Sequence, residues 1–258
     1  MKVLKFGGSS LADAQRYMRV TEISTTIHQA SGAAVVLSAP KGVTNALGAL
    51  CDQAAAGEDY SALFAELDKK VNGIAEELNA QLEGFEFARI SDFIATHLSA
   101  LNKQLQGIAL LGCSPDPVTA SIMSLGEYIS VNLFSAILTA QGVSNIVIDP
   151  VKYVLAEGDY LDSIADVALS KARFSDVNTD GSQLIIMPGF VAANEAGEKV
   201  TLGRNGSDYS AAVLAACIDA ECCEIWTDVD GVYNADPNQV EGAVLLDKLT
   251  YQEAMELS

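Results

Sequence analysis

The sequence predicts an α/β protein with a mainly parallel central sheet covered by helices on both faces. Short apolar runs alternate along the chain with longer stretches in which apolar residues recur every three or four positions. Most of the short runs end in glycine, proline, serine or aspartate, which is typical of strands bounded by loops. Half of the 258 residues are apolar, which is enough to build a large core.

Six short apolar runs are predicted to be strands. Several are rich in β-branched residues, which is typical of strands buried on both faces. Ligands bind beyond the carboxyl ends of the strands in such sheets, so polar residues at those ends are candidate site residues. The predicted strands are residues 2–6, 33–37, 143–148, 183–187, 200–202 and 222–226.

Helical periodicity accounts for most of the remaining chain, and an apolar stripe requires only packing. His97 lies on such a stripe, so we interpret it as a packed side chain. Gly126 lies inside a helix, where glycine costs about 1 kcal/mol relative to alanine, so we expect a close approach to the backbone there. The predicted helices are residues 17–27, a segment ending near 56, residues 63–82, 87–108 and 118–140, a segment ending at 216, and residues 249–257.

The charge of the chain excludes two classes of partner. Lysine and arginine number 15 against 34 acidic residues, giving a net charge of -19 that repels nucleic acids and acidic membrane surfaces. No run of 18 or more uninterrupted apolar residues and no signal peptide is evident, so we expect a cytoplasmic protein that binds neither nucleic acid nor membrane. The five cysteines form no zinc motif, and we expect buried, reduced thiols.

A first glycine turn follows residues 2–6. Lys5 precedes Gly7, Gly8 and Ser9, and the spacing fits neither a dinucleotide fingerprint nor a Walker loop. The Lys5 ammonium is placed to reach a phosphate held on the backbone N–H groups of the turn. The alternative is a solvated lysine at a strand end.

A second glycine turn lies between residues 202 and 210. Ser207 or Asp208 is suited to cap the following helix, and free N–H groups at its start form an anion site. Arg204 adds a planar fork of donors for a carboxylate or phosphate. The alternative is an ordinary strand-turn-helix corner.

Three further sets of polar residues are candidates. Ser38 and Thr44 are placed to bind a substrate carboxylate, although Thr44 alone is better explained as a helix cap. Glu127 beside Gly126 is either a ligand for an ammonium group or an exposed glutamate. The loop after residue 226 contains Asp228, Asp230 and Asp236, which are either magnesium ligands or turn residues.

Taken together, five motifs in order resemble those of the aspartokinases, in particular the N-terminal kinase part of the bifunctional aspartokinase–homoserine dehydrogenases. The resemblance runs from residue 2 to residue 258 and implies the three-layer α/β/α amino-acid-kinase fold. It also implies an N-terminal lobe of about residues 1–198 that binds aspartate and a truncated C-terminal lobe of about residues 199–258 that binds nucleotide. The motifs are KFGGSS at 5–10, SAPKGVTN at 38–45, SLGE at 124–127, GRNGSDYSA at 203–211 and WTDVDGVY at 226–233.

The resemblance implies transfer of the γ-phosphoryl group of ATP to the side-chain carboxylate of L-aspartate, the first step toward threonine, methionine and lysine. A carboxylate with a pKa near 3.9 is already ionised at neutral pH and needs no general base. Magnesium is expected on the ATP phosphates, with no direct protein ligand assigned, and the full-length enzyme is expected to be a homo-oligomer. The implied site residues are Lys5 and Asp208 for catalysis; Ser38, Thr44, Glu127, Phe190 and Arg204 for substrate; and Lys5, Gly7, Gly8, Ser9, Thr227, Asp228, Tyr233 and Asp236 for nucleotide.

Two departures from the family pattern leave alternatives open. Asn238 follows Asp236-Pro237 where arginine is frequent, which removes a phosphate contact, and the chain ends before a Phe-Gly-Ala-Lys segment that contributes to ATP binding. The alternatives are a non-catalytic aspartate-binding fragment and another amino-acid kinase, such as one acting on acetylglutamate. A dinucleotide-dependent dehydrogenase is disfavoured because no G-x-G-x-x-G motif follows a strand.

Overall fold

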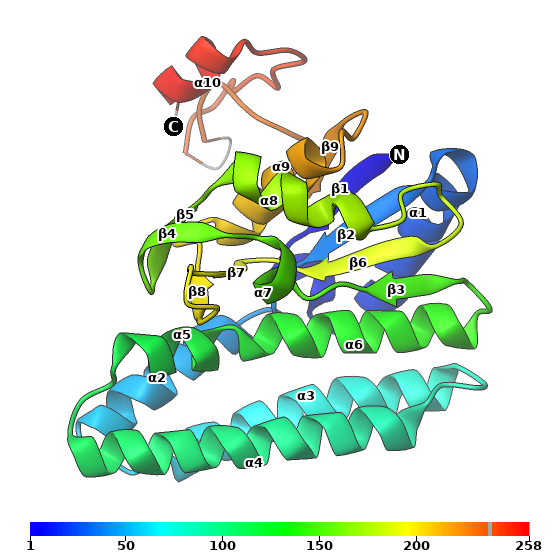
Figure 1. Cartoon of the computed structure of the whole chain (residues 1–258). Helices are drawn as coiled ribbons and strands as arrows, with labels where there is room; N and C mark the ends of the chain where they lie inside the picture. Colours follow the sequence, from blue (N-terminus) through cyan, green and yellow to red (C-terminus); the bar gives the residue numbers. More distant parts are fainter. Residues whose placement is uncertain (237–238, 258) are drawn as a thin grey trace. The chain divides into compact units, whose positions relative to one another are not determined.

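A five-stranded parallel sheet forms the centre of residues 1–226, with the strands in the order β3-β6-β2-β1-β9 (Figure 1). The structure is a computed structural model that describes residues 1–236 and 239–257. The predicted α/β class with a parallel sheet is confirmed. The strands are β1 (Lys2–Phe6), β2 (Ala33–Leu37), β3 (Asn145–Val147), β6 (Leu184–Pro188) and β9 (Cys223–Trp226).

Alternate side chains of the sheet build two separate cores. Leu4 and Phe6 of β1 pack on one face, and Val3 packs on the other. Every residue of β2 is buried because the strand lies at the centre of the sheet. In contrast, Ile146 and Val147 are exposed because β3 is an edge strand, so the prediction of a buried strand there is wrong.

Helices α1 and α6 cover the first face, and α3 and α4 lie beyond α6 (Figure 1). The second face is covered by α7, α8 and α9 and by two antiparallel hairpins, β4–β5 and β7–β8. The helices are α1 (Ala14–Ser31), α2 (Val43–Ala55), α3 (Ser61–Gln81), α4 (Phe87–Leu111), α5 (Asp116–Met123), α6 (Leu125–Ala140), α7 (Pro150–Tyr153), α8 (Val167–Arg173) and α9 (Gly206–Cys217). The hairpin strands are β4 (Ala156–Asp159), β5 (Asp162–Ala165), β7 (Val191–Ala193) and β8 (Lys199–Thr201), and short 3-10 turns span η1 (Gly8–Leu11) and η2 (Phe174–Asp176).

The stretch predicted as one helix over residues 118–140 is two helices, α5 and α6, that meet at Ser124. Together, residues Asp116–Ala140 are long and apolar enough to cross a membrane, but 72% of the most apolar window is buried inside the protein, which accounts for its hydrophobicity. The expected close approach at Gly126 is confirmed. A Cβ at Gly126 would lie 2.5 Å from Ala39 Cβ and 2.9 Å from Val43 Cγ1.

Residues 227–258 form a second compact unit, in which the structure describes α10 (Tyr251–Leu257) and a bridge between Tyr233 and Leu245. The division falls after Trp226 because β9 pairs with β1, so β8, α9 and β9 belong to the first unit. The lobe boundary near residue 198 stays a prediction.

The five cysteines are free thiols, and their burial is mixed. Cys51 and Cys217 are buried, as expected. Cys113, in the turn after α4, and Cys223, on the edge strand β9, are exposed, so the prediction of burial is wrong for these two.

Candidate functional site

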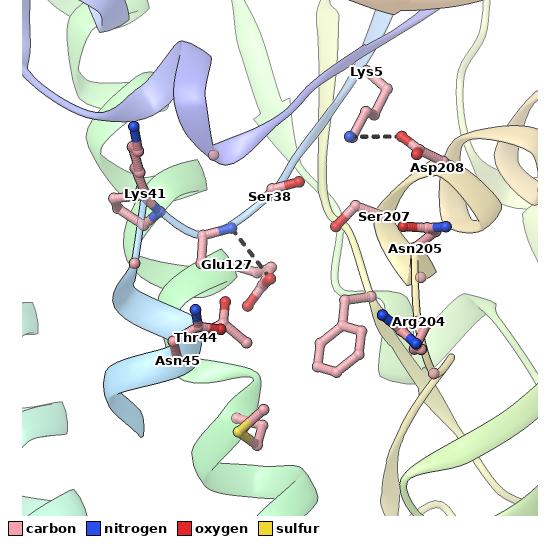
Figure 2. Close-up of a pocket in the computed structure, with 18 of the residues that line it drawn as sticks. Lys5, Ser38, Lys41, Thr44, Asn45, Glu127, Arg204, Asn205, Ser207 and Asp208 are labelled. Atoms are coloured by element: carbon pink, nitrogen blue, oxygen red, sulfur yellow. Dashed lines mark hydrogen bonds and ion pairs between the residues drawn. The ribbon is translucent and has the colours of Figure 1, made fainter. Parts of the chain in front are cut away.

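The carboxyl ends of β1, β2 and β6 open into a cavity of about 930 Å³, called here the first cavity (Figure 2). Three segments far apart in sequence form its walls: the loop from Ser38 to Asn45, the start of α6, and the turn from Gly203 to Asp208. The parallel sheet brings these segments to one edge. The first cavity is lined by Lys5, Gly8, Ser38, Ala39, Pro40, Lys41, Gly42, Thr44, Asn45, Met123, Glu127, Leu161, Asp162, Phe190, Gly203, Arg204, Asn205, Gly206, Ser207 and Asp208.

Lys5 and Asp208 form an ion pair inside the first cavity. Lys5 Nζ lies 2.6 Å from Asp208 Oδ1, and the Lys5 side chain is 12% exposed. Lys5 belongs to the buried strand β1, and Asp208 belongs to the first turn of α9. The pairing holds the ammonium group at the strand end, where the dashed contact in Figure 2 shows it.

The first glycine turn packs tightly against its neighbours. A Cβ at Gly7 would lie 3.4 Å from Lys5 Nζ, and a Cβ at Gly8 would lie 2.9 Å from the carbonyl oxygen of Ala39. Glycine at both positions therefore lets the ammonium group and the Ser38–Asn45 loop approach the backbone of the turn. Gly8 lines the first cavity, whereas Gly7 and Ser9 are not among its lining residues.

Glu127 is the most deeply buried charged group of the first cavity. Its side chain is 3% exposed, and its Oε1 accepts a hydrogen bond of 3.2 Å from the backbone N–H of Ala39. Its Oε2 is buried and has no hydrogen-bond partner among the described residues. Burial raises the pKa of Glu127 to about 8. The carboxyl group is therefore poised to gain a cationic partner, and the interpretation as an exposed glutamate is wrong.

The turn that carries Arg204 depends on two residues with positive φ. Gly203 has φ +67°, and a Cβ there would collide with Asp162 Oδ1. Asn205 has φ +56° and is the N-cap of α9, so the prediction that Ser207 or Asp208 caps this helix is wrong. Asparagine tolerates the left-handed conformation better than most residues. Arg204 is exposed and faces Glu127 across the first cavity (Figure 2).

Phe190 lines the first cavity in a left-handed backbone conformation with φ +69°. Its backbone N–H donates to Ser210 Oγ at 2.8 Å, and its carbonyl oxygen accepts from the N–H of Leu202 at 2.8 Å. These bonds hold the strained residue in place, which is typical of positions under functional constraint. A Cβ at Gly206 would lie 2.7 Å from Phe190 Cδ2, so the turn before α9 packs directly on this ring.

Ser38 and Thr44 both line the first cavity, as predicted for substrate-binding hydroxyls. Thr44 does not cap a helix, because the N-cap of α2 is Gly42 with φ +81° and no side chain makes a capping hydrogen bond. The Thr44 hydroxyl is therefore available to the first cavity. Lys41, on the same loop, is exposed.

Four predicted nucleotide residues belong to the second compact unit. In that unit, Thr227 Oγ1 donates to Asp228 Oδ1 at 3.1 Å, and Gln239 Nε2 donates to Asp236 Oδ2 at 2.8 Å. Tyr233 forms the bridge with Leu245. These contacts lie within the second unit, and the role of the four residues in nucleotide binding stays a prediction. Pro237 and Asn238 lie outside the described residues.

Sequence reasoning missed several polar residues of the first cavity, among them Asp162 and Asn45. Asp162 begins β5, a short strand that was not predicted, and no apolar pattern precedes it. Asn45 follows Thr44 at the start of α2, and its place in the motif at residues 38–45 was the available signal. Within the described part of the chain, no three His, Cys, Asp or Glu side chains cluster closely enough to hold a metal ion.

Sequence comparisons match the chain over its whole length. The sequence pattern described as "Amino acid kinase family" matches residues 1–258. The bifunctional aspartokinase/homoserine dehydrogenase of Buchnera aphidicola subsp. Acyrthosiphon pisum is 44% identical over 266 residues, covering 100% of this chain and 32% of that protein. The corresponding protein of Haemophilus influenzae is 42% identical over 258 residues, with the same coverage of 100% and 32%. The chain thus spans about a third of the length of these curated relatives.

Structural comparisons lead to related proteins. The crystal structure of E. coli aspartokinase III in complex with aspartate and ADP superimposes with a TM-score of 0.87 and 30% identity, covering 99% of this chain and 55% of that one. The complex of the same protein with lysine and aspartate gives a TM-score of 0.83 and 29% identity, covering 96% of this chain and 54% of that one.

Proposed function

This chain belongs to the amino acid kinase family, and on that premise we propose that it transfers the γ-phosphoryl group of ATP to the side-chain carboxylate of L-aspartate. The observation that carries the proposal is the pairing of opposite charges across the first cavity. Glu127 presents a buried, unpartnered carboxyl oxygen on one wall, and Arg204 presents a guanidinium group on the other. An α-amino acid carries the ammonium and carboxylate that complement these two groups.

The binding mode follows from the chemistry of the lining residues. The Glu127 carboxylate binds the ammonium group of aspartate, and Arg204 binds its α-carboxylate through two parallel hydrogen bonds. Ser38 and Thr44 bind the side-chain carboxylate. Phe190 closes the substrate side of the first cavity.

Phosphoryl transfer needs no proton transfer from the protein. An oxygen of the aspartate side chain forms a bond to the γ-phosphorus while the bond to the β-phosphate oxygen breaks, so ADP leaves and the acyl phosphate remains. The difficulty is electrostatic, because an anion must approach a polyanion. Lys5 neutralises charge on the transferring group, and Asp208 positions the Lys5 ammonium at 2.6 Å.

The proposal includes ATP and magnesium as co-substrates. The Gly7-Gly8 turn and Lys5 fit a phosphate group, because the turn has no side chain to obstruct it. Magnesium is proposed to bind through the ATP phosphates, with no direct protein ligand assigned. Thr227, Asp228, Tyr233 and Asp236 are proposed to contact the nucleotide.

The relatives support this assignment. An aspartokinase that is 30% identical over 99% of this chain has been crystallised with aspartate and ADP. Two relatives above 40% identity have aspartokinase as one of their two activities by name. We also propose a cytoplasmic location, a homo-oligomeric full-length enzyme, and a role at the first step toward threonine, methionine and lysine.

The test is hydroxylamine trapping of the acyl phosphate with L-aspartate, ATP and magnesium. We expect aspartate hydroxamate from the wild type and a rate reduced by about 100- to 1000-fold in Lys5→Ala, the loss typical of removing one charge-stabilising donor. Lys2→Ala is the matched control, because Lys2 lies on the same strand but pairs with Glu224 outside the first cavity.

The alternatives give different outcomes. A non-catalytic aspartate-binding fragment gives no hydroxamate but retains aspartate binding by calorimetry. Absence of both would contradict the assignment. An acetylglutamate kinase would prefer N-acetyl-L-glutamate, which has no ammonium group for Glu127 and is therefore disfavoured by the buried carboxyl group.

A further inference from the structure

A second cavity of about 320 Å³ lies among α4, the junction of α5 and α6, α7 and β8. It shares a wall with the first cavity. Met123 and Glu127 line the first cavity, whereas Ser124, Leu125 and Tyr128 line the second. The proposed phosphoryl transfer uses none of the residues of the second cavity.

Lys199 supplies a positive charge in the second cavity, and the negative charge of Asp149 opposes part of the effect of burial on the pKa of Lys199. Its Nζ lies 4.3 Å from the centre of the Tyr128 ring, and the side chain is half-buried. No carboxylate lies within ion-pair distance of it among the described residues. Burial lowers the pKa of Lys199, which reflects the cost of keeping this ammonium group charged away from water. An anionic group bound beside Lys199 would offset that cost.

Asp149 supplies a negative charge to the same cavity. Its Oδ1 accepts hydrogen bonds from the Tyr128 hydroxyl at 2.7 Å and from the backbone N–H of Val151 at 3.1 Å. These bonds fix the carboxylate at the start of α7. Its Oδ2 accepts no hydrogen bond from the described residues and remains available to a donor.

The rest of the second cavity combines an apolar surface with one more ionisable group. Leu101, Ile122 and Leu125 contribute aliphatic carbon. His97 also lines it, with Nδ1 lying 2.8 Å from the carbonyl oxygen of Phe93, so that nitrogen carries the proton and donates. A pocket with a few convergent polar groups on an apolar lining is typical of a small-molecule site.

We propose that the second cavity binds a free α-amino acid with a small aliphatic side chain. The ligand's carboxylate pairs with Lys199, its ammonium group pairs with Asp149 Oδ2, and its side chain contacts the apolar surface of Leu101, Ile122 and Leu125. An amino acid bound in the second cavity contacts the α5–α6 junction on the side that faces away from the first cavity. Glu127 lies on the side that faces the first cavity.

The test is calorimetric titration of the wild type with three matched probes. L-valine carries both charged groups, isovalerate lacks the ammonium group, and isobutylamine lacks the carboxylate. We expect L-valine to bind more tightly than either of the other two probes. Lys199→Met removes the charge and keeps the aliphatic stem, and we expect it to weaken L-valine by about tenfold or more, since each charged contact is among the stronger hydrogen bonds.

Two further variants test the contribution of Asp149 and the specificity of the effect of Lys199. Asp149→Asn keeps the acceptor for Tyr128, and we expect it to weaken the binding of L-valine without weakening that of isovalerate. Lys152→Met is the matched control, because Lys152 also lies over a tyrosine ring, that of Tyr153, but does not line the second cavity. We expect Lys152→Met to bind L-valine as the wild type does.

Three results would overturn the proposal. The first is no heat of binding with L-valine in the wild type. The second is L-valine binding that is unchanged in Lys199→Met. The third is L-valine binding that survives Lys199→Met and is lost in Arg204→Ala, which would place the ligand in the first cavity instead.

Discussion

The two walls of the first cavity hold their charged groups in different ways. On the α6 wall, Glu127 is 3% exposed and is fixed by burial and by the hydrogen bond from the N–H of Ala39. On the opposite wall, Arg204 is exposed, and the backbone turn through Gly203 and Asn205 directs it. One group is positioned by the packing around it, and the other is positioned by the conformation of its own loop.

Because of this difference, the two walls are sensitive to different changes. A buried carboxyl group responds to pH and to changes in packing, because water does not screen it. An exposed guanidinium group responds mainly to removal of its own charge. The variants below separate the two kinds of dependence, beginning with the largest expected effect.

Removal of the exposed charge is expected to give the largest loss of affinity. Arg204→Ala should raise the Kd for L-aspartate by about 10- to 100-fold, since hydrogen bonds to charged groups contribute about 1.5–3 kcal/mol. Calorimetry measures this Kd. Arg173→Ala, at the exposed end of α8 and away from the first cavity, is the control. An unchanged Kd in Arg204→Ala would show that this residue does not bind the substrate.

Neutralising the buried carboxyl group is expected to change the pH dependence of binding. The ammonium group of aspartate favours ionised Glu127, whose pKa is about 8 in the free protein. The Kd for L-aspartate should therefore rise as the pH falls below about 8, by up to about tenfold per pH unit. Glu127→Gln should abolish this slope, whereas Asp162→Asn, which alters an exposed carboxylate of the same cavity, should keep it. A wild-type Kd independent of pH would contradict the role of Glu127.

The same carboxyl group is expected to affect stability in the absence of ligand. The pKa of Glu127 is about 8 in the folded protein, above the ordinary value of 4.5. The folded state therefore binds more protons between these values, and its free energy of unfolding should fall as the pH rises from 4.5 to about 8. Urea unfolding across this pH range measures how the free energy of unfolding changes with pH. This change should be less steep in Glu127→Gln than in the wild type. Equal slopes would show that Glu127 ionises as freely as it does in water.

Packing of the α6 wall is expected to affect the stability of the fold. Gly126→Ala places a methyl group 2.5 Å from Ala39 Cβ, and such overpacking costs about 1–3 kcal/mol of unfolding free energy. Gly107→Ala is the matched control, because a Cβ at this helical glycine would meet nothing within 4 Å and should stabilise by up to about 1 kcal/mol. Urea unfolding measures the free energy of unfolding of the two variants and so distinguishes their effects. Equal changes in the free energy of unfolding for the two variants would mean that the loop from Ser38 to Asn45 shifts to accommodate the methyl group.

Particular residues show how far the sequence predicts this site. Lys5, Glu127 and Arg204 were found because a glycine lies within two residues of each of them in a recognisable motif. Asp162 was missed because the hairpin that carries it is short and only partly apolar. The cap of α9 was assigned to the wrong residue, because a positive φ at Asn205 depends on how the turn packs on Phe190.

Local sequence patterns predict the five strands of the central sheet, most of the helices and the glycine turns, because apolar periodicity and glycine's conformational freedom act over a few neighbouring residues. Tertiary packing determines that Glu127 is buried with a free oxygen, that Arg204 faces it, and that Lys199 lies over Tyr128 with no carboxylate within ion-pair distance among the described residues. These pairings join elements far apart in the chain. They depend on the order of the strands and the packing of the helices, which local sequence patterns do not encode.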